Sequence, residues 1–157
     1  MTSINNLFSK KYIKITITII VLILSFLISL LLYGIKKDSI RRTFVFPSVD
    51  AGKYVIEYRN LYDKPYQGQI NYFVEEILLG STIERTKTIF TPGTKLLSCF
   101  ERGNTLYVNL SSELLNMGKN VVDIKEGMEL LQKNIKLNFT KVHKVEIFVN
   151  GKAAFEN

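Results

Sequence analysis

The sequence predicts an α+β fold, in which a small mixed sheet has two helices packed on one face and is preceded by one transmembrane helix. Residues 15–35 carry no charged side chain. Later segments alternate apolar and polar residues with the period of a strand, and two others repeat apolar residues with the period of a helix. Their order, strands, helix, hairpin, helix and strand, is typical of an α+β fold.

The apolar segment is long enough to cross a bilayer, because a helix of residues 15–35 would extend roughly 32 Å. A secretory signal has a shorter apolar core and a small-residue cleavage site. This segment instead ends in LLYGIKK, and the one cysteine, Cys99, lies far downstream. A buried core helix would not be apolar on every face. We therefore expect a short tail (residues 1–14), an uncleaved transmembrane anchor (15–35) and a basic juxtamembrane linker (36–42).

The distribution of charge argues for a membrane partner and against nucleic acid. The whole chain has a net charge of +7, but residues 43–157 contain 14 Lys and Arg against 13 Asp and Glu. The excess flanks the anchor, at Lys10, Lys11, Lys14, Lys36, Lys37, Arg41 and Arg42. Anionic lipid headgroups lie at these positions, whereas a nucleic-acid binder carries its basic patch on the domain. The flanks differ little in basic residues, and the positive-inside rule slightly favours a cytoplasmic domain.

Two strands and a helix are expected at the start of the domain. Residues 43–47, TFVFP, and residues 53–59, KYVIEYR, have the composition and alternation of strands. For the helix, Asp63 is a typical capping residue, Pro65 suits the first turn, and Gly80 suits the position just after the last turn. The apolar face has helical spacing, at Ile70, Phe73, Val74, Ile77 and Leu78.

A hairpin is expected next, with strands at residues 95–100 and 105–110 around a turn at residues 101–104. Its second strand alternates between an inner and an outer face. The inner face is formed by Leu106, Val108 and Leu110, and the outer face by Tyr107 and Asn109.

A second helix and a last strand complete the predicted domain. Asp123 and Glu126 have the spacing of a capping box at the start of a helix. The residues expected to point inward from that helix are Ile124, Met128, Leu131 and Ile135. The last strand lies in KVEIFVNGK, residues 144–152, before an Asn-Gly turn. Its expected inner face is formed by Val145, Ile147 and Val149.

The side chains with potential chemistry lack the partners that catalysis or metal binding requires. The one histidine, His143, and Cys99 do not have metal-ligand spacing, and we interpret Cys99 as a small apolar residue. A nucleophilic Ser111 would need a base within reach, so we interpret it as a residue that satisfies amides where a strand ends. Glu126 and Glu129 are interpreted as a solvated helix face. We expect no catalytic residue, no cofactor and no metal.

The soluble part resembles the GerMN domain, the module named for the spore-germination protein GerM. The matching pieces occur in the family's order, as VFP (45–47), VEEILLG (74–80), TPGTKLLS (91–98), LYVNLSSEL (106–114) and KVEIFVNGK (144–152). The resemblance implies a compact α/β domain, here residues 43–157, that lies outside the cytoplasm and is held at a bacterial envelope by an anchor or lipid. It also implies similarity to ring-building folds of secretion and sporulation complexes. The family has no established catalytic residues to carry over.

We therefore expect a non-enzymatic envelope protein with a single-pass anchor in the bacterial inner (cytoplasmic) membrane. Its extracytoplasmic domain would bind other envelope proteins or itself. Tyr107 and Phe148, each opposite in phase to the core face of its strand, are the candidate partner-binding surface, unless a helix layer or a terminus covers them. The alternative is a module that binds cell-wall glycan or a small ligand. Exposed rings could serve it, at Tyr54, Tyr58, Tyr62, Tyr66 and Tyr107.

Overall fold

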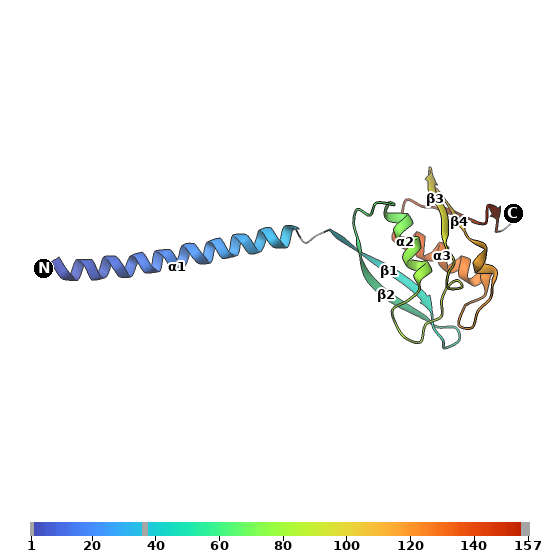
Figure 1. Cartoon of the computed structure of the whole chain (residues 1–157), viewed down its shortest axis with the longest axis horizontal. Coiled ribbons are helices and arrows are strands. Elements are labelled where there is room, and N and C mark those ends of the chain that lie inside the picture. The colour runs from blue at the N-terminus through green and yellow to red at the C-terminus, as the bar shows by residue number, and fades with distance from the viewer. Residues whose placement is uncertain (1, 36–37, 155–157) are drawn as a thin grey trace. The chain divides into compact units, whose positions relative to one another are not determined.

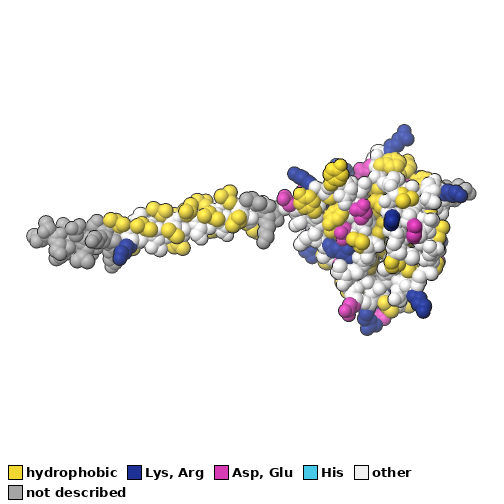
Figure 2. Space-filling view, viewed as in Figure 1, with side chains coloured by type: hydrophobic (Ala, Val, Ile, Leu, Met, Phe, Trp, Pro, Cys, Tyr) yellow, Lys and Arg dark blue, Asp and Glu magenta, His cyan; other side chains and the backbone are white. Residues whose placement is uncertain are grey.

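The computed structural model describes residues 2–35 and 38–154 of the chain. The chain forms two compact units, Met1–Ser39 and Ile40–Asn157. The first unit contains one long helix, α1 (Thr2–Ile35), so most of the expected N-terminal tail is helical. Within it, Tyr12–Gly34 is long and apolar enough to cross a membrane. Figure 2 shows the apolar side chains along this helix.

Within its described residues, the second unit contains two sheets, two α-helices and one short 3-10 helix, and Figure 1 shows their arrangement. The strands are β1 (Ser39–Pro47), β2 (Tyr54–Tyr62), β3 (Leu96–Arg102), β4 (Thr105–Leu110), β5 (Lys144–Val149) and β6 (Lys152–Ala153). The helices are α2 (Gln69–Leu79) and α3 (Ile124–Asn138), with a short 3-10 helix, η1 (Ser112–Leu115), between them.

The mixed sheet with helices on one face is confirmed. It has the order β3-β4-β5-β6, with β4 and β5 parallel and the other neighbours antiparallel. The sequence did not reveal that β1 and β2 form a separate two-stranded sheet. Because β1 begins at Ser39, residues 39–42 of the expected linker belong to that strand.

One hydrophobic core joins the inner faces of both sheets to the two helices. The predicted inward faces are confirmed where the helices are most deeply buried, at Phe73, Val74 and Ile77 of α2 and at Met128, Leu131 and Ile135 of α3. The rings of Phe44 and Phe73 stack with centroids 4.7 Å apart. This contact links the first sheet directly to α2.

The predicted start of the first helix is wrong. The chain first makes a turn, in which the Gly68 amide donates to the Pro65 carbonyl, and α2 then begins at Gln69 after Gly68, whose φ is 86°. Asp63 instead accepts from the Gln69 side-chain amide through its carbonyl and its Oδ1, at 2.7 and 2.8 Å. Gly80, with φ 89°, follows the last residue of the helix as predicted.

The predicted start of the second helix is confirmed, but its cap differs in detail. Asp123 precedes α3, and its Oδ1 accepts from the Lys125 amide at 2.9 Å, one residue earlier than a capping box requires. Glu126 makes a different contact, because its carboxylate accepts a hydrogen bond from the Tyr54 hydroxyl at 3.4 Å.

Two asparagines of α3 bind the backbone of β1. The Asn134 amide accepts from Val45 N and donates to Val45 O, at 2.7 and 2.9 Å. Asn138, one turn later, makes the same pair of bonds with Thr43, at 2.9 and 2.6 Å. These side chains occupy the positions that a further strand would take along β1, so this edge of the first sheet is closed by a helix.

Candidate functional site

Three aromatic rings lie side by side on the face of the four-stranded sheet that points away from the helices. Phe100 of β3 and Tyr107 of β4 stack with centroids 5.1 Å apart and ring planes 11° apart. Phe148 of β5 continues the row, 6.4 Å from Tyr107 with planes 28° apart. We call Phe100, Tyr107 and Phe148 the aromatic platform.

The strand register explains why these rings meet. Phe100 pairs directly with Tyr107 across the β3–β4 hairpin, and directly opposed side chains in a sheet stand close together. Phe148 pairs with Asn109, two residues beyond Tyr107 on β4, so Phe148 and Tyr107 are diagonal neighbours on one face. The rings are accessible: Phe100 is 56% exposed, and Tyr107 and Phe148 are half-buried.

A shallow hollow of about 210 Å³ lies over the platform, with Ser98, Asn109 and Gly151 on its rim. The Asn109 Oδ1 accepts a hydrogen bond from the Gly151 amide at 3.0 Å. This bond fixes the asparagine and ties the turn after β5 to the neighbouring strand. The hollow therefore combines a flat apolar floor with a polar rim held in place by the sheet.

The structure places both candidate residues, Tyr107 and Phe148, on this one face. Phe100 was not identified from the sequence, although the two-residue turn at Gly103 and Asn104 sets the register that pairs it with Tyr107. Neither α2 nor α3 covers the platform, since both helices pack on the opposite face through the buried residues of β4 and β5.

The polar residues after β4 end the strand, as expected. The Ser111 hydroxyl accepts from the Lys95 amide at 2.9 Å, and the Ser111 amide donates to the Lys95 carbonyl at 2.9 Å. His143 lies near the other end of β4, where its Nδ1 is 3.3 Å from the Asn104 side-chain amide. Ser111 therefore has no histidine base beside it.

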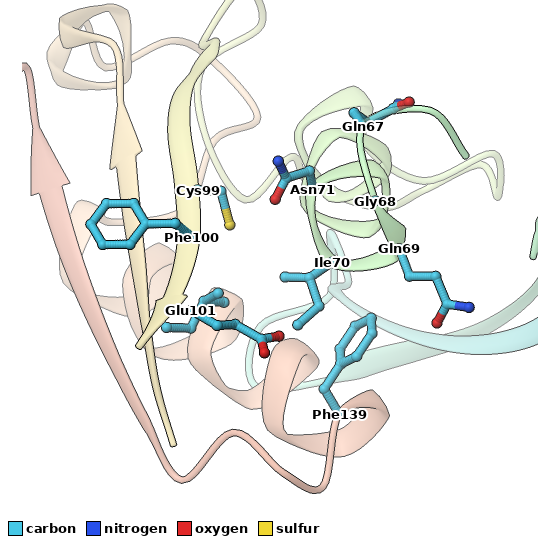
Figure 3. A pocket seen from close by; sticks show the side chains of 10 residues that line it. Gln67, Gly68, Gln69, Ile70, Asn71, Cys99, Phe100, Glu101 and Phe139 are labelled. Atoms are coloured by element: carbon cyan, nitrogen blue, oxygen red, sulfur yellow. The ribbon is translucent and has the colours of Figure 1, made fainter. Parts of the chain in front are cut away.

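A second hollow, of about 450 Å³, lies between the start of α2 and β3 (Figure 3). Cys99 points toward it and Phe100 points to the other side of the strand. Burial and the nearby Glu101 raise the pKa of the Cys99 thiol to about 12, so the thiol stays protonated at neutral pH. Among the side chains that the structure describes, no group of three His, Cys, Asp or Glu residues could hold a metal ion.

A charged cluster that was not predicted from the sequence lies on the buried face of β2. Arg59 donates from Nε to Glu57 Oε1 at 2.7 Å and from Nη1 to Glu76 Oε2 at 3.1 Å. Ser81 and Thr82 donate their hydroxyl groups to Glu57 at 2.7 and 2.6 Å. These bonds tie β2 to α2 and to the loop that follows it.

Hydrogen bonding decides the protonation state of this cluster. Burial alone would raise the pKa of Glu57, but hydrogen bonds from Arg59, Thr82 and Ser81 outweigh it and lower the pKa to about 2. Glu57 is 6% exposed, and its two oxygens are engaged by these donors. The cluster therefore holds elements together rather than presenting a free acid or base.

The tyrosines considered for sugar binding do not form a single patch. Tyr54, Tyr58 and Tyr62 share the outer face of β2 and are about half exposed. Tyr66 is fully exposed in the following loop, while Tyr107 belongs to the aromatic platform on the other sheet.

Comparison with known proteins decides the family. Residues 43–155 match the family model called Germane, described as "Sporulation and spore germination". The chain belongs to the Germane family. The resemblance to GerMN domains that the sequence indicated is therefore confirmed.

Solved structures share the fold of this Germane domain. The tandem GerMN domains of the sporulation protein GerM from Bacillus subtilis match with a TM-score of 0.61 and 16% identity. That match covers 75% of this chain and 42% of the tandem chain. The first GerMN domain of the same protein gives a TM-score of 0.59 and 16% identity, over 73% of this chain and 85% of that one.

A curated relative of this Germane protein comes from Treponema pallidum (strain Nichols) and is named an uncharacterized lipoprotein. It is 32% identical over 90 residues, which are 57% of this chain and 67% of the relative. The name of the relative and the apolar helix α1 both agree with attachment to a membrane.

Proposed function

We propose that this Germane protein is a single-pass protein of the bacterial inner membrane, whose domain lies outside the cytoplasm and acts by docking rather than by catalysis. Its partners would be other envelope proteins or a second copy of itself. The observation that carries the proposal is the aromatic platform, three neighbouring rings from three strands on an accessible sheet face. Large aromatic residues supply much of the binding energy in protein interfaces.

The surroundings of the platform suit a protein partner. Lys144 and Glu146 on β5 form an ion pair at 2.6 Å, and Glu146 pairs with Tyr107 in the strand register. An apolar centre with a polar and charged rim is the usual anatomy of an interface. Attachment to a membrane would raise the local concentration of the domain, so an interface of modest area would suffice.

The second candidate function is binding of cell-wall glycan. It is favoured by the near-parallel rings of Phe100 and Tyr107 and by the polar rim of the hollow, at Ser98 and Asn109. Flat rings with amide and hydroxyl groups beside them match a sugar, which has apolar faces and polar edges. Both functions use the same surface, so one set of variants tests both.

Site-specific photo-crosslinking in intact cells tests the docking surface. A photoreactive phenylalanine analogue at position 100 should form crosslinks to a protein partner. The same analogue at Glu129, an exposed residue of α3, should not. Crosslinks of equal yield at both positions, or at neither, would contradict docking through the platform.

Phe100→Asp provides the complementary test. Because Phe100 is 56% exposed, this change should preserve the circular dichroism spectrum and abolish crosslinks from an analogue placed at position 148. Pull-down with purified peptidoglycan separates the two candidate functions. Retention of wild type but not of Phe100→Asp, without protein crosslinks, would favour the glycan function.

A further inference from the structure

A second apolar surface lies on the outer face of β2, in the other sheet. Every second residue of β2 lies on this face. Four of them, Tyr54, Ile56, Tyr58 and Tyr62, are 49%, 57%, 56% and 54% exposed, with the exposed Asn60 between the last two. We call these four residues the tyrosine stripe. Large apolar side chains in a row at this exposure indicate a surface that meets an apolar or interfacial environment.

One end of the stripe lies beside the start of β1. The two strands have nine residues each and are joined by residues 48–53, so they run antiparallel. The Ser48 amide donates to the Lys53 carbonyl at 2.9 Å, a pairing that places Ser39 opposite Tyr62. Arg41 confirms the shared face, because its Cζ lies 4.3 Å from the centre of the Tyr58 ring.

The other end of the stripe is partly occupied by α3. The Tyr54 hydroxyl donates to Glu126 at 3.4 Å, and Lys133 Nζ lies 5.2 Å from the centre of the Tyr54 ring. Tyr58 and Tyr62 are therefore the part of the stripe that is free to contact another surface. Ile56 lies between these two residues and Tyr54.

The covalent chain limits how far this free part can lie from a membrane that holds α1. The apolar span ends at Gly34 and β1 begins at Ser39. A fully extended chain advances at most about 3.6 Å per residue, so Ser39 lies within roughly 18 Å of the end of the span. Tyr62, opposite Ser39, is held to a similar distance.

The side chains near this end have the chemistry of a membrane interface. Tyrosine is enriched at the headgroup level, where its ring contacts apolar groups and its hydroxyl contacts water. Basic residues near the surface are attracted to anionic lipids. The sequence places Lys36, Lys37 and Lys64 on the flanks of β1 and β2 at this end and Arg41 within β1, against Asp38 and Asp63.

We propose that Tyr58 and Tyr62 rest in the headgroup region of the bilayer that α1 spans. The contact rests on the proposed anchoring of α1 and adds an orientation of the domain. With the stripe against lipid, the aromatic platform, on the far side of the shared core, faces away from the membrane. The partner of the stripe is therefore the lipid surface rather than a protein.

The chain contains no tryptophan, so a single introduced tryptophan reports on one position. Full-length Tyr58→Trp is reconstituted in vesicles of phosphatidylcholine and phosphatidylglycerol, with or without bromine on the upper part of the acyl chains. Phe100→Trp is the matched control, because Phe100 and Tyr58 are both 56% exposed. The expected result is a loss of emission in brominated vesicles for Tyr58→Trp and no loss for Phe100→Trp.

The flotation and quenching results distinguish failure of the proposed lipid contact from failure of the proposed anchor. Vesicle flotation is measured first, and failure of the wild-type chain to float would overturn both. Flotation with equal emission in the two kinds of vesicle would overturn the lipid contact alone. A blue-shifted Tyr58→Trp emission that bromine does not quench would also overturn it, since a protein surface would then cover the stripe. Tyr62→Trp repeats the measurement if circular dichroism shows that Tyr58→Trp is misfolded.

Discussion

Arg59 shows how a charged side chain is stabilised on the buried face of a sheet. Its guanidinium contacts Glu57 and Glu76, donates to the Gly80 carbonyl at 2.6 Å, and lies 4.7 Å from the centre of the Phe44 ring. Its own pKa is raised, because the hydrogen bonds and charges of the two glutamates outweigh the effect of burial. The arginine therefore stays charged, and removing it would leave two carboxylates without their cation.

Arg59→Leu should lower the free energy of unfolding by about 3 to 5 kcal/mol at pH 7, because removing one partner leaves buried charge unpaired. Chemical denaturation measures the change. Arg85→Leu is the control, since Arg85 pairs with Asp50 at 3.2 Å on the surface, where both are exposed. That pair should contribute less than about 1 kcal/mol. Equal effects of the two changes would contradict the structural role of the cluster.

The same cluster predicts a dependence of stability on pH. Glu57 has a pKa of about 2 in the folded chain, below its ordinary value of 4.5. A lowered pKa in the folded state stabilises the fold above the ordinary value, and the contribution is lost as the pH falls. The free energy of unfolding of wild type should therefore fall between pH 4.5 and about 2. Arg59→Leu should show a smaller fall over that window, and an identical fall would contradict the assignment.

At the scale of elements, α3 contributes side-chain amides as well as apolar residues. Asn134 is fully buried and its amide also donates to the Leu130 carbonyl at 2.9 Å. The same side chain thus satisfies the backbone of β1 and of its own helix. A strand edge buried against a helix would otherwise leave amide and carbonyl groups unsatisfied.

Asn134→Leu should destabilise the domain by roughly 2 to 5 kcal/mol, because the buried amide and carbonyl of Val45 each lose a partner. Leucine has a similar size, so the change tests the hydrogen bonds rather than the volume. Glu129→Leu, on the exposed side of the same helix, is the control and should change stability by less than about 0.5 kcal/mol. A negligible effect of Asn134→Leu in thermal denaturation would contradict this role.

The elements with strong periodicity were predictable from the sequence. The inner faces of α2 and α3 follow from apolar spacing, and the β3–β4 hairpin follows from its turn, because these signals are local. The turn before α2 was not predictable, since Asp63 is a plausible cap whose actual partner, Gln69, depends on a turn at Gly68.

The two faces of β2 show why the charged cluster at Glu57 and Arg59 could not be predicted from the sequence. Alternation alone cannot tell which face is buried. Apolar content favours Tyr54, Ile56 and Tyr58, yet the buried face carries Glu57 and Arg59. The reversal depends on partners distant in sequence, such as Glu76. Phe100 was missed for a different reason: its pairing with Tyr107 could have been obtained from the hairpin turn.

At the scale of the whole molecule, the fold separates two surfaces of different chemistry. The aromatic platform lies on the outer face of one sheet and the tyrosine stripe on the outer face of the other, with the shared core between them. If the tyrosine stripe contacts lipid as proposed, the platform is the side of the domain that is left available to a partner. This division supports a docking role for the platform.

The proposed topology of the chain is open to direct measurement. Alkaline phosphatase is active outside the cytoplasm, and green fluorescent protein exported in unfolded form stays dark. Fusions after residue 157 should therefore give active phosphatase and no fluorescence. This expectation rests on the resemblance to GerMN domains, since the basic flanks alone slightly favour the opposite orientation. The domain, nearly neutral in charge, offers little resistance to transfer.

Deletion of residues 15–35 is the matched control for these fusions. Without these residues the phosphatase fusion should be inactive and the green fluorescent protein fusion should fluoresce, because a chain without the apolar span stays in the cytoplasm. If the intact chain gave a fluorescent fusion and inactive phosphatase, the domain would be cytoplasmic, as the slight excess of basic residues after the span would then indicate. The platform would in that case face cytoplasmic partners, and binding of cell-wall glycan would be ruled out. The lipid contact of Tyr58 and Tyr62 would be unaffected, because it depends on the distance to the bilayer and not on the side.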